Sequence, residues 1–225
     1  MIRIAALVEG PTERNFGQRV LAPHLAQHGV ALSPKVIGKS GHKGGNKWEV
    51  AKREIIALMR QGFVHCTTMF DLYGLPQDWP GRAEARQKGL KKVDASRFIE
   101  MAIEAEIART MNVNIQELHF SAYLSLHEYE ALLFSDPQQL ATVTLGVSDA
   151  EKFAAIIAEC GGCEQINDDP LTAPSKRILQ VSNGYKKPSD GAVAAQRIGL
   201  KIMREKCPHF AQWLTRLEQL GTANS

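Results

Sequence analysis

One stretch near the start of the chain decides the fold: Ile2-Arg3-Ile4-Ala5-Ala6-Leu7-Val8-Glu9-Gly10-Pro11-Thr12-Glu13. Residues 2–8 form a nearly continuous apolar run, which is typical of a strand buried on both faces of a parallel sheet. Pro11 suits the first turn of a helix because an N–H would have no partner there, and Thr12 is a candidate N-cap. The stretch therefore predicts a buried strand, a turn that begins with an acidic residue, and a helix.

Strand and helix patterns alternate after this stretch. Helical spacing covers 13–28, where Pro23 is expected to kink the helix or end it early. Further strand and helix patterns cover 30–37, 48–61, 63–70, 94–111 and 118–124. Asp94 is the expected cap of the fourth of these, and Ser125 and Glu128 have the spacing of a capping box that would open another helix. The alternation predicts an α/β fold with a mainly parallel central sheet and flanking helices.

The last part of the chain is mostly helical by pattern, with helices expected over 149–160 and 207–220. We therefore expect an α/β core over 1–137 and a helical C-terminal extension over 138–225 that packs on the same domain. A chain of 225 residues is long enough for one large domain with a real core.

Composition excludes several classes of protein. Hydrophobic residues make up 44% of the chain and charged residues 23%, which is too apolar for a disordered protein. No apolar run reaches the roughly 20 residues of a membrane span, and the start lacks the pattern of a signal peptide. With only four cysteines, the expected location is the cytoplasm. Cys66 reads as a core residue, and Cys160 and Cys163 have redox or zinc spacing but no second pair.

Acidic residues follow three of the predicted strands. Glu9 comes directly after the first strand, Asp71 ends the third, and Glu128 and Glu130 follow the fourth, with Glu13 in the first turn of the first helix. Because the carboxyl ends of parallel strands share one edge, these side chains are expected to meet there. Clustered carboxylates raise each other's pKa unless a cation neutralises them, and Mg²⁺ prefers oxygen ligands. The pattern therefore favours phosphoryl transfer with a divalent metal.

Each of these acids also has a structural interpretation. Glu9 can stabilise a helix N-terminus, Asp71 can bond loop amides in an Asx turn, and Glu128 can be the second half of a capping box. Both interpretations stay open at this point.

Basic residues are concentrated in two runs, over 82–97 and 172–206, although the net charge is only +3. Lys43 lies in the glycine-rich loop Gly38–Asn46, whose amides are candidates to hold phosphate. Lys176, Arg177, Lys186 and Lys187 lie near the end of the chain, and Tyr185 beside them suits stacking on single-stranded nucleic acid. The alternative is a solvated helix face. Trp79, in the long loop expected over 72–92, is expected either to stack on a base or to pack on the core as a lid.

Three motifs, in order, resemble a known bacterial family. Val8-Glu9-Gly10-Pro11-Thr12-Glu13 resembles the first motif of the Toprim fold, shared by topoisomerases, primases and the overcoming-lysogenization-defect (OLD) nucleases. Phe70-Asp71-Leu72-Tyr73-Gly74-Leu75-Pro76 with Trp79-Pro80-Gly81, and then His127-Glu128-Tyr129-Glu130-Ala131-Leu132-Leu133-Phe134, resemble the family catalogued as domain of unknown function 4276 (DUF4276), a Toprim-like family. With Tyr185-Lys186-Lys187, the resemblance spans most of the chain.

The resemblance implies roles for particular residues. Glu9 would be the Toprim glutamate, a metal ligand or general acid–base group, and Asp71 the first acid of an Asp-x-Asp motif. Tyr73 occupies the second acidic position, and tyrosine, with a pKa of about 10, cannot replace a carboxylate as an Mg²⁺ ligand. Either Glu128 or Glu130 supplies the missing oxygen, or metal binding is weakened. Relatives of this kind resemble partners of ABC-type or AAA ATPases in phage defence.

The leading hypothesis is a nuclease that uses Mg²⁺ or Mn²⁺ to hydrolyse DNA or RNA. Glu9, Asp71 and Glu130 would be catalytic, the same three with Glu128 would bind the metal, and Lys43, Lys176, Arg177, Lys186 and Lys187 would contact nucleic acid. The alternatives are a non-catalytic regulatory or nucleic-acid-binding subunit of an ATPase complex, favoured by Tyr73, and a small-molecule phosphohydrolase. A homo-oligomer is compatible with the apolar stripe on the helix after Asp149.

Overall fold

The computed structural model describes residues 1–38, 47–144, 146, 148–166, 169 and 171–222 of the chain. Its centre is a parallel sheet with the order β2-β1-β3-β4, in which β5 also pairs with β3. The strands are β1 (Ile2–Val8), β2 (Val30–Val36), β3 (His65–Asp71), β4 (Phe120–Ser121) and β5 (Leu124–Ser125). The expected α/β architecture with a mainly parallel sheet is confirmed.

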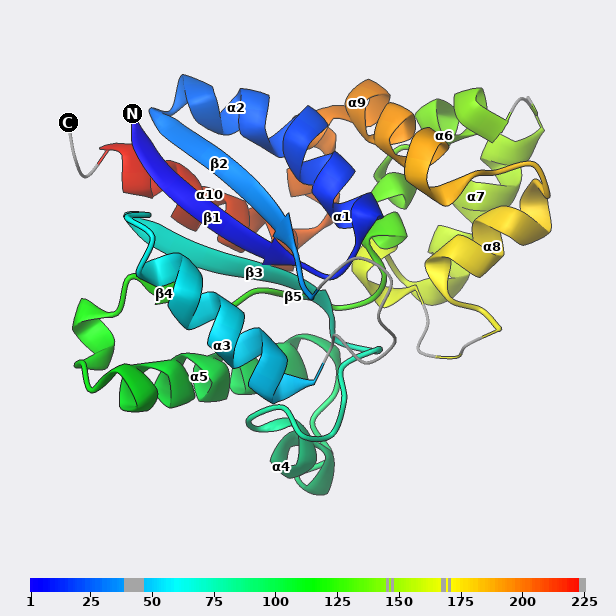
Figure 1. Cartoon of the computed structure of the whole chain (residues 1–225). Helices are drawn as coiled ribbons and strands as arrows, with labels where there is room; N and C mark the ends of the chain where they lie inside the picture. Colours follow the sequence, from blue (N-terminus) through cyan, green and yellow to red (C-terminus); the bar gives the residue numbers. More distant parts are fainter. Residues whose placement is uncertain (39–46, 145, 147, 167–168, 170, 223–225) are drawn as a thin grey trace.

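Helices cover both faces of this sheet (Figure 1). The first part of the chain contributes α1 (Pro11–Phe16), the π-helical η1 (Gly17–Leu21), α2 (Ala22–Gln27), α3 (Trp48–Met59), α4 (Arg82–Gln87), α5 (Lys92–Met111) and the short η2 (Ile115–Glu117). The later part contributes η3 (Tyr129–Ser135), α6 (Pro137–Thr144), α7 (Asp149–Cys160), η4 (Cys163–Gln165), α8 (Pro174–Val181), α9 (Lys187–Lys206) and α10 (Pro208–Thr222). None of the described helices is long and apolar enough to cross a lipid bilayer.

The alternation of side chains along β1 explains the layers. Ile4, Ala6 and Val8 belong to one buried cluster, which includes side chains of α1, α9 and α10. Ala5 and Leu7 point to the other face and belong to a second cluster, which includes side chains of α3 and α5. The helical C-terminal part thus shares a core with the first strand, and the sheet is covered on both sides as a parallel sheet requires.

The predicted strand over 118–124 is only partly present. β4 and β5 are two-residue strands, separated by Ala122 and Tyr123. The amides of this segment are satisfied by side chains: Ala122 N donates to Glu104 Oε1 (3.0 Å), Tyr123 N to Thr68 Oγ1 (2.9 Å) and Leu124 N to Glu100 Oε1 (2.8 Å). Because Glu100 and Glu104 lie on α5, this helix replaces a continuous strand ladder there.

Several expected helix starts are wrong. Gly10, not Thr12, is the N-cap of α1, and Lys91, not Asp94, is the N-cap of α5. The capping box is not formed, because Ser125 pairs with Asp71 in the sheet and a 3₁₀ helix begins only after Glu128. In each case the backbone path set by neighbouring elements overrides the local cap signal.

Pro23 neither ends nor interrupts the first helical segment. The turn before it widens into a π-helix, in which Ala22 N donates to Gly17 O, and α2 continues with Pro23 in its first turn. A π-turn is a recognised way of accommodating a local disruption of the helical ladder.

Trp79 packs on the core, as the lid interpretation expected. Its side chain is 2% exposed, and its ring centroid lies 5.1 Å from both Trp48 and Phe70. The segment around it also contains α4, so 72–92 is not wholly loop.

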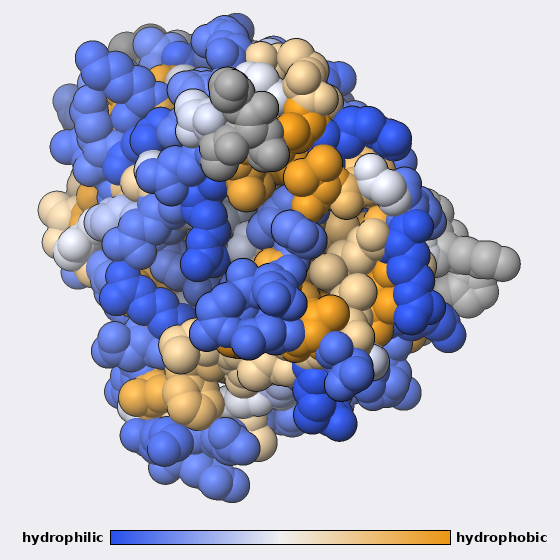
Figure 2. Space-filling model, turned by 90° about the vertical axis from the view of Figure 1, so that its left-hand side faces the viewer, coloured by the Kyte–Doolittle hydropathy of each residue, from blue (hydrophilic) through white to orange (hydrophobic). Residues whose placement is uncertain are grey.

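Figure 2 shows the face at the amino ends of the strands, which is mostly hydrophilic with apolar side chains between the polar ones. The carboxyl ends of β1 and β3 lie at the opposite edge of the sheet, where α1 and η3 begin (Figure 1).

Candidate functional site

The strand order places the ends of β1 and β3 at a switch point. The chain leaves β1 for β2 on one side, and β3 returns on the other side of β1. Ligands of open α/β sheets bind outside the carboxyl ends of the strands at such a point. Glu9 follows β1 and Asp71 ends β3, and the structure brings them together: Asp71 N donates to Glu9 Oε2 at 3.2 Å. Two residues far apart in sequence therefore share one edge.

Three further carboxylates join them from the helices around this edge. Glu13 lies in the first turn of α1, Glu128 is the N-cap of η3, and Glu130 lies in its first turn. We call Glu9, Glu13, Asp71, Glu128 and Glu130 the acidic cluster. Among the described residues, the Asp71 carboxylate accepts no hydrogen bond, so the alternative Asx turn is not formed.

Lys187, the first residue of α9, inserts its side chain into the acidic cluster. Its Nζ lies 3.0 Å from Glu128 Oε1 and 3.1 Å from Glu130 Oε2. Burial alone would lower the pKa of Lys187, but Glu130 and Glu128 raise it above its ordinary value overall. Lys187 is therefore a fixed positive charge inside the site, and its ammonium is held by carboxylates instead of facing outward to a phosphate.

Glu130 is the most deeply buried member of the acidic cluster, with 0% of its surface exposed. Burial raises its pKa to about 8, although Lys187 acts in the opposite direction. Apart from the ion-pair contact with Lys187, neither carboxylate oxygen has a well-aligned hydrogen bond to the described residues. The Tyr185 hydroxyl is also buried without such a bond. A buried, poorly satisfied carboxyl group of this kind is costly and is typical of functional sites.

Asp71 and Glu13 are also shifted toward protonation. Burial raises the pKa of Asp71 well above its ordinary value, and Glu9, Glu13 and Glu130 add to this effect while Lys187 opposes it. Burial raises the pKa of Glu13, and Glu9 adds to it. Burial and crowding thus disfavour the ionised forms of these carboxyl groups, and a bound cation would favour them.

Glu128 has a structural role beside its place in the acidic cluster. Its Oε2 accepts a hydrogen bond from Ser175 N at 2.9 Å, in the first turn of α8. Burial opposes ionisation, but the bonds from Ser175 and Lys187 outweigh it and lower the pKa of Glu128. The Glu128 carboxylate therefore joins η3 to the start of α8, and each of its oxygens has a partner: Ser175 N for Oε2 and Lys187 Nζ for Oε1.

The donor set of this edge suits a hard divalent cation, because it consists of carboxylate oxygens. The carboxylates do not form a tight cage, however. Among the described residues, a tight set of three metal-capable side chains occurs elsewhere: one ligand atom each of His24, His28 and Glu218 lie within 4.8 Å of one another, at α2 and α10. Mg²⁺ usually takes only one or two carboxylates and keeps several waters, so Glu9 and Asp71 are a sufficient protein contribution.

The expected nucleic-acid contacts divide into three groups. Lys43 lies outside the described residues, as does most of its loop. Lys176 and Lys186 are exposed. Arg177 is buried and bonds Thr172 O (3.2 Å) and Glu159 Oε2 (3.3 Å), so its guanidinium serves the fold.

Tyr185 is 6% exposed and cannot offer its ring to a base in this arrangement, which corrects the stacking expectation. Lysines next to a tyrosine in the sequence do not determine whether its ring is exposed. The residues between α8 and α9 instead turn this ring inward against Gly191, where an added Cβ would lie 2.9 Å from the Tyr185 hydroxyl.

The cysteines carry no disulfide among the described residues; Cys66, Cys160, Cys163 and Cys207 are all free. Cys66 is buried in the core, as expected, and burial raises its pKa to about 12. Cys163 interacts with Cys207, which lies between α9 and α10. Cys160 and Cys163 are close in sequence, but the contact that Cys163 makes is with Cys207, which is distant in sequence.

Lys187 is the residue whose role the sequence did not predict. Lys187 lies nearly sixty residues after its partners Glu128 and Glu130, and nothing in the local sequence distinguishes it from the adjacent Lys186. Glu13 carried one usable signal, since its position in the first turn after the first strand already predicted that it could face the same crevice.

Comparison with known proteins gives one match. No curated protein and no solved structure matches the chain. The model of the family described as Domain of unknown function (DUF4276) matches residues 8–218, which contain every member of the acidic cluster and Lys187. The chain therefore belongs to the DUF4276 family.

Proposed function

We propose that this protein is a nuclease that hydrolyses phosphodiester bonds of DNA or RNA with Mg²⁺ or Mn²⁺, in the manner of Toprim-like enzymes. The observation that carries the proposal is the state of Asp71. This carboxylate lies at the switch point of a parallel sheet, where burial raises its pKa, Glu9, Glu13 and Glu130 add to this effect, and Lys187 only partly offsets it. A divalent cation is the natural partner of such a site.

Within this proposal Glu9 and Asp71 hold the metal directly. Bound there, the ion would polarise a phosphoryl oxygen and lower the pKa of a water molecule. Glu130 has a pKa of about 8 and is mostly protonated at neutral pH, so it joins the metal ligands only by releasing its proton. Lys187 keeps Glu128 and Glu130 in place, and the exposed Lys176 and Lys186 are the described candidates for the flanking phosphates.

The test is a metal titration followed by a cleavage assay on labelled single- and double-stranded DNA and RNA. Glu9→Gln and Asp71→Asn remove a charge with little change of shape, and we expect both to abolish Mg²⁺ or Mn²⁺ binding and cleavage while the unfolding midpoint stays within a few degrees. Glu49→Gln is the matched control, because the Glu49 side chain is 76% exposed on α3. Wild-type cleavage by either site variant would remove these residues from the mechanism.

A second candidate is a non-catalytic subunit that uses the same edge to bind an ATPase or nucleic acid. Two observations favour it: Tyr73 stands at the second acidic position of the motif, and Lys187 already lies between two of the carboxylates. This candidate is supported if the wild type neither binds a divalent metal nor cleaves nucleic acid. It must still bind a polynucleotide or an ATPase encoded nearby. We expect either activity in the cytoplasm, which the four free cysteines support.

A further inference from the structure

Two histidines on α2 face a glutamate on α10, away from the acidic cluster. His24 and His28 are four residues apart on or at the end of the helix, so their rings lie on one face, with centroids 4.9 Å apart. Glu218 Oε1 lies 2.6 Å from His24 Nε2 and 3.9 Å from His28 Nε2. One ligand atom of each residue lies within 4.8 Å of the others.

The glutamate is held in position by its own partners. The Glu218 side chain is 11% exposed, and Arg204 Nη1 contacts its Oε1 at 2.6 Å. Arg204 is fixed in turn by its Nη2, which donates to Thr215 Oγ1 at 2.8 Å. A carboxylate that is oriented by a second group in this way resembles the outer-shell arrangement of metal sites.

The two helices approach each other closely enough to fix this geometry. A Cβ at Gly221, one turn beyond Glu218 on α10, would overlap the carbonyl oxygen of His28. Only glycine permits this approach, and it brings the end of α2 directly against α10. The three candidate ligands are therefore on helices whose relative position is set by backbone packing, and not on mobile loops.

The donor set identifies the class of ion. Two imidazoles and one carboxylate suit Zn²⁺, and three protein ligands leave a fourth tetrahedral position open. Bonds of about 2.1 Å place tetrahedral ligand atoms about 3.4 Å apart. The present separations from Glu218 of 2.6 Å and 3.9 Å fall on either side of that value. Reaching it requires each separation to change by less than about 1 Å, and Arg204 Nη1, which now contacts Oε1, would move to the other carboxylate oxygen.

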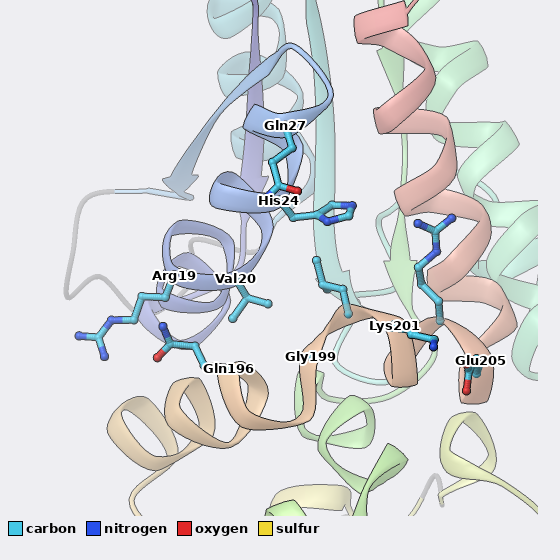
Figure 3. A pocket seen from close by; sticks show the side chains of 10 residues that line it. Arg19, Val20, His24, Gln27, Gln196, Gly199, Lys201 and Glu205 are labelled. Carbon is cyan, nitrogen blue, oxygen red and sulfur yellow. The ribbon is translucent and has the colours of Figure 1, made fainter.

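A cavity adjoins the open side of this site. Its volume is about 680 Å³, and His24 projects from α2 into it, opposite the broken part of α9 at Gly199 (Figure 3). Arg19, Lys201 and Arg204 also line it, so its charged lining residues are basic apart from Glu205. Water or a small anion can therefore reach a fourth coordination position from this side.

We propose that His24, His28 and Glu218 form a Zn²⁺ site, with Arg204 as a positioning residue that orients Glu218. The site is separate from the acidic cluster and does not depend on the proposed nuclease activity.

The experiment is calorimetric titration of the full chain with Zn²⁺, alongside visible absorption with Co²⁺ as a spectroscopic substitute. We expect a Zn²⁺-binding event that Asp71→Asn retains, and an intense tetrahedral Co²⁺ spectrum without a thiolate charge-transfer band. His28→Gln is expected to weaken binding by more than the roughly 10–100-fold that loss of an outer-shell partner costs. The His28 side chain is 38% exposed, so this substitution is mild for the fold, and His24→Gln provides a second ligand variant.

Two controls make the result specific. His119→Gln changes an exposed histidine outside the site and should bind as the wild type does. Asp71→Asn should also retain Zn²⁺ binding, which separates this site from the acidic cluster. Equal binding by wild type, His24→Gln and His28→Gln would overturn the proposal, and so would a Co²⁺ spectrum with a thiolate band, since that would assign the metal to the cysteines.

Discussion

Replacing Glu130 by glutamine should stabilise the protein, and more so as the pH rises. Glu130 is fully buried in η3, and its pKa is about 8 compared with 4.5 for an unperturbed glutamate. Because the folded state keeps a proton that the unfolded state releases, this group lowers the free energy of unfolding as the pH rises from about 4.5 to about 8. Glutamine has nearly the same shape and does not ionise, so Glu130→Gln removes that pH dependence. Lys187 keeps its contact with Glu128 at 3.0 Å.

The magnitude follows from the two pKa values. Integrated between about pH 5 and pH 8, the shift from 4.5 to about 8 costs the wild type about 3 kcal/mol of unfolding free energy. For a chain of this size each kcal/mol corresponds to about 2–4 °C in Tm, so the gap between variant and wild type should widen by about 6–12 °C over this range.

The assay is urea and thermal denaturation of wild type, Glu130→Gln and the exposed control Glu49→Gln at several pH values across that range, without divalent metal. A stability difference between Glu130→Gln and wild type that stays constant with pH would refute the assignment of the buried proton to Glu130. Addition of Mg²⁺ or Mn²⁺ extends the test: if Glu130 completes the metal site, the ion displaces the proton and the gap at high pH narrows.

Two further substitutions test the loop after β3. Trp79→Ala should lower the free energy of unfolding, measured by urea denaturation, by about 3–5 kcal/mol. The reason is that the ring is 2% exposed and its centroid lies 5.1 Å from those of both Trp48 and Phe70. A decrease of less than about 1 kcal/mol would contradict this packing. Tyr73→Asp should raise the Mg²⁺ affinity by at least about tenfold, or 1.4 kcal/mol, because it adds a carboxylate at a position that is 42% exposed. Calorimetry measures this affinity, and Tyr73→Asn is the neutral control. Equal affinity of the two variants would exclude position 73 from the metal site.

The sequence predicts the sheet and its acidic edge because both depend on local patterns. The apolar run over 2–8 is long enough to require burial on both faces, and a parallel sheet brings the residues after its strands to one edge. Glu9 and Asp71 are therefore neighbours for a topological reason, which needs no knowledge of side-chain packing. The described helices α3, α7 and α10 likewise follow the predicted ranges closely.

Long-range polar contacts were not predictable in the same way. Lys187 pairs with Glu128 and Glu130 because of where α9 begins in space, and the sequence shows only a lysine among other lysines. The break between β4 and β5 has the same origin: Glu100 and Glu104 accept amide hydrogens that a strand neighbour would otherwise receive. Patterns of hydrophobicity carry no information about such partners.

The amides taken up by Glu100 and Glu104 also limit how this protein can associate with itself. They leave the β4–β5 side of the sheet with few free donors for an incoming strand. At the opposite border, β2 carries Pro34, which has no donor, and Lys35, which opposes stacking of like chains. Growth by strand addition, the usual route from an open sheet to fibrous aggregates, is thereby blocked at both margins. Any stable dimer is expected to form through helical surfaces, and concentrated samples should resist fibril formation while the native state persists.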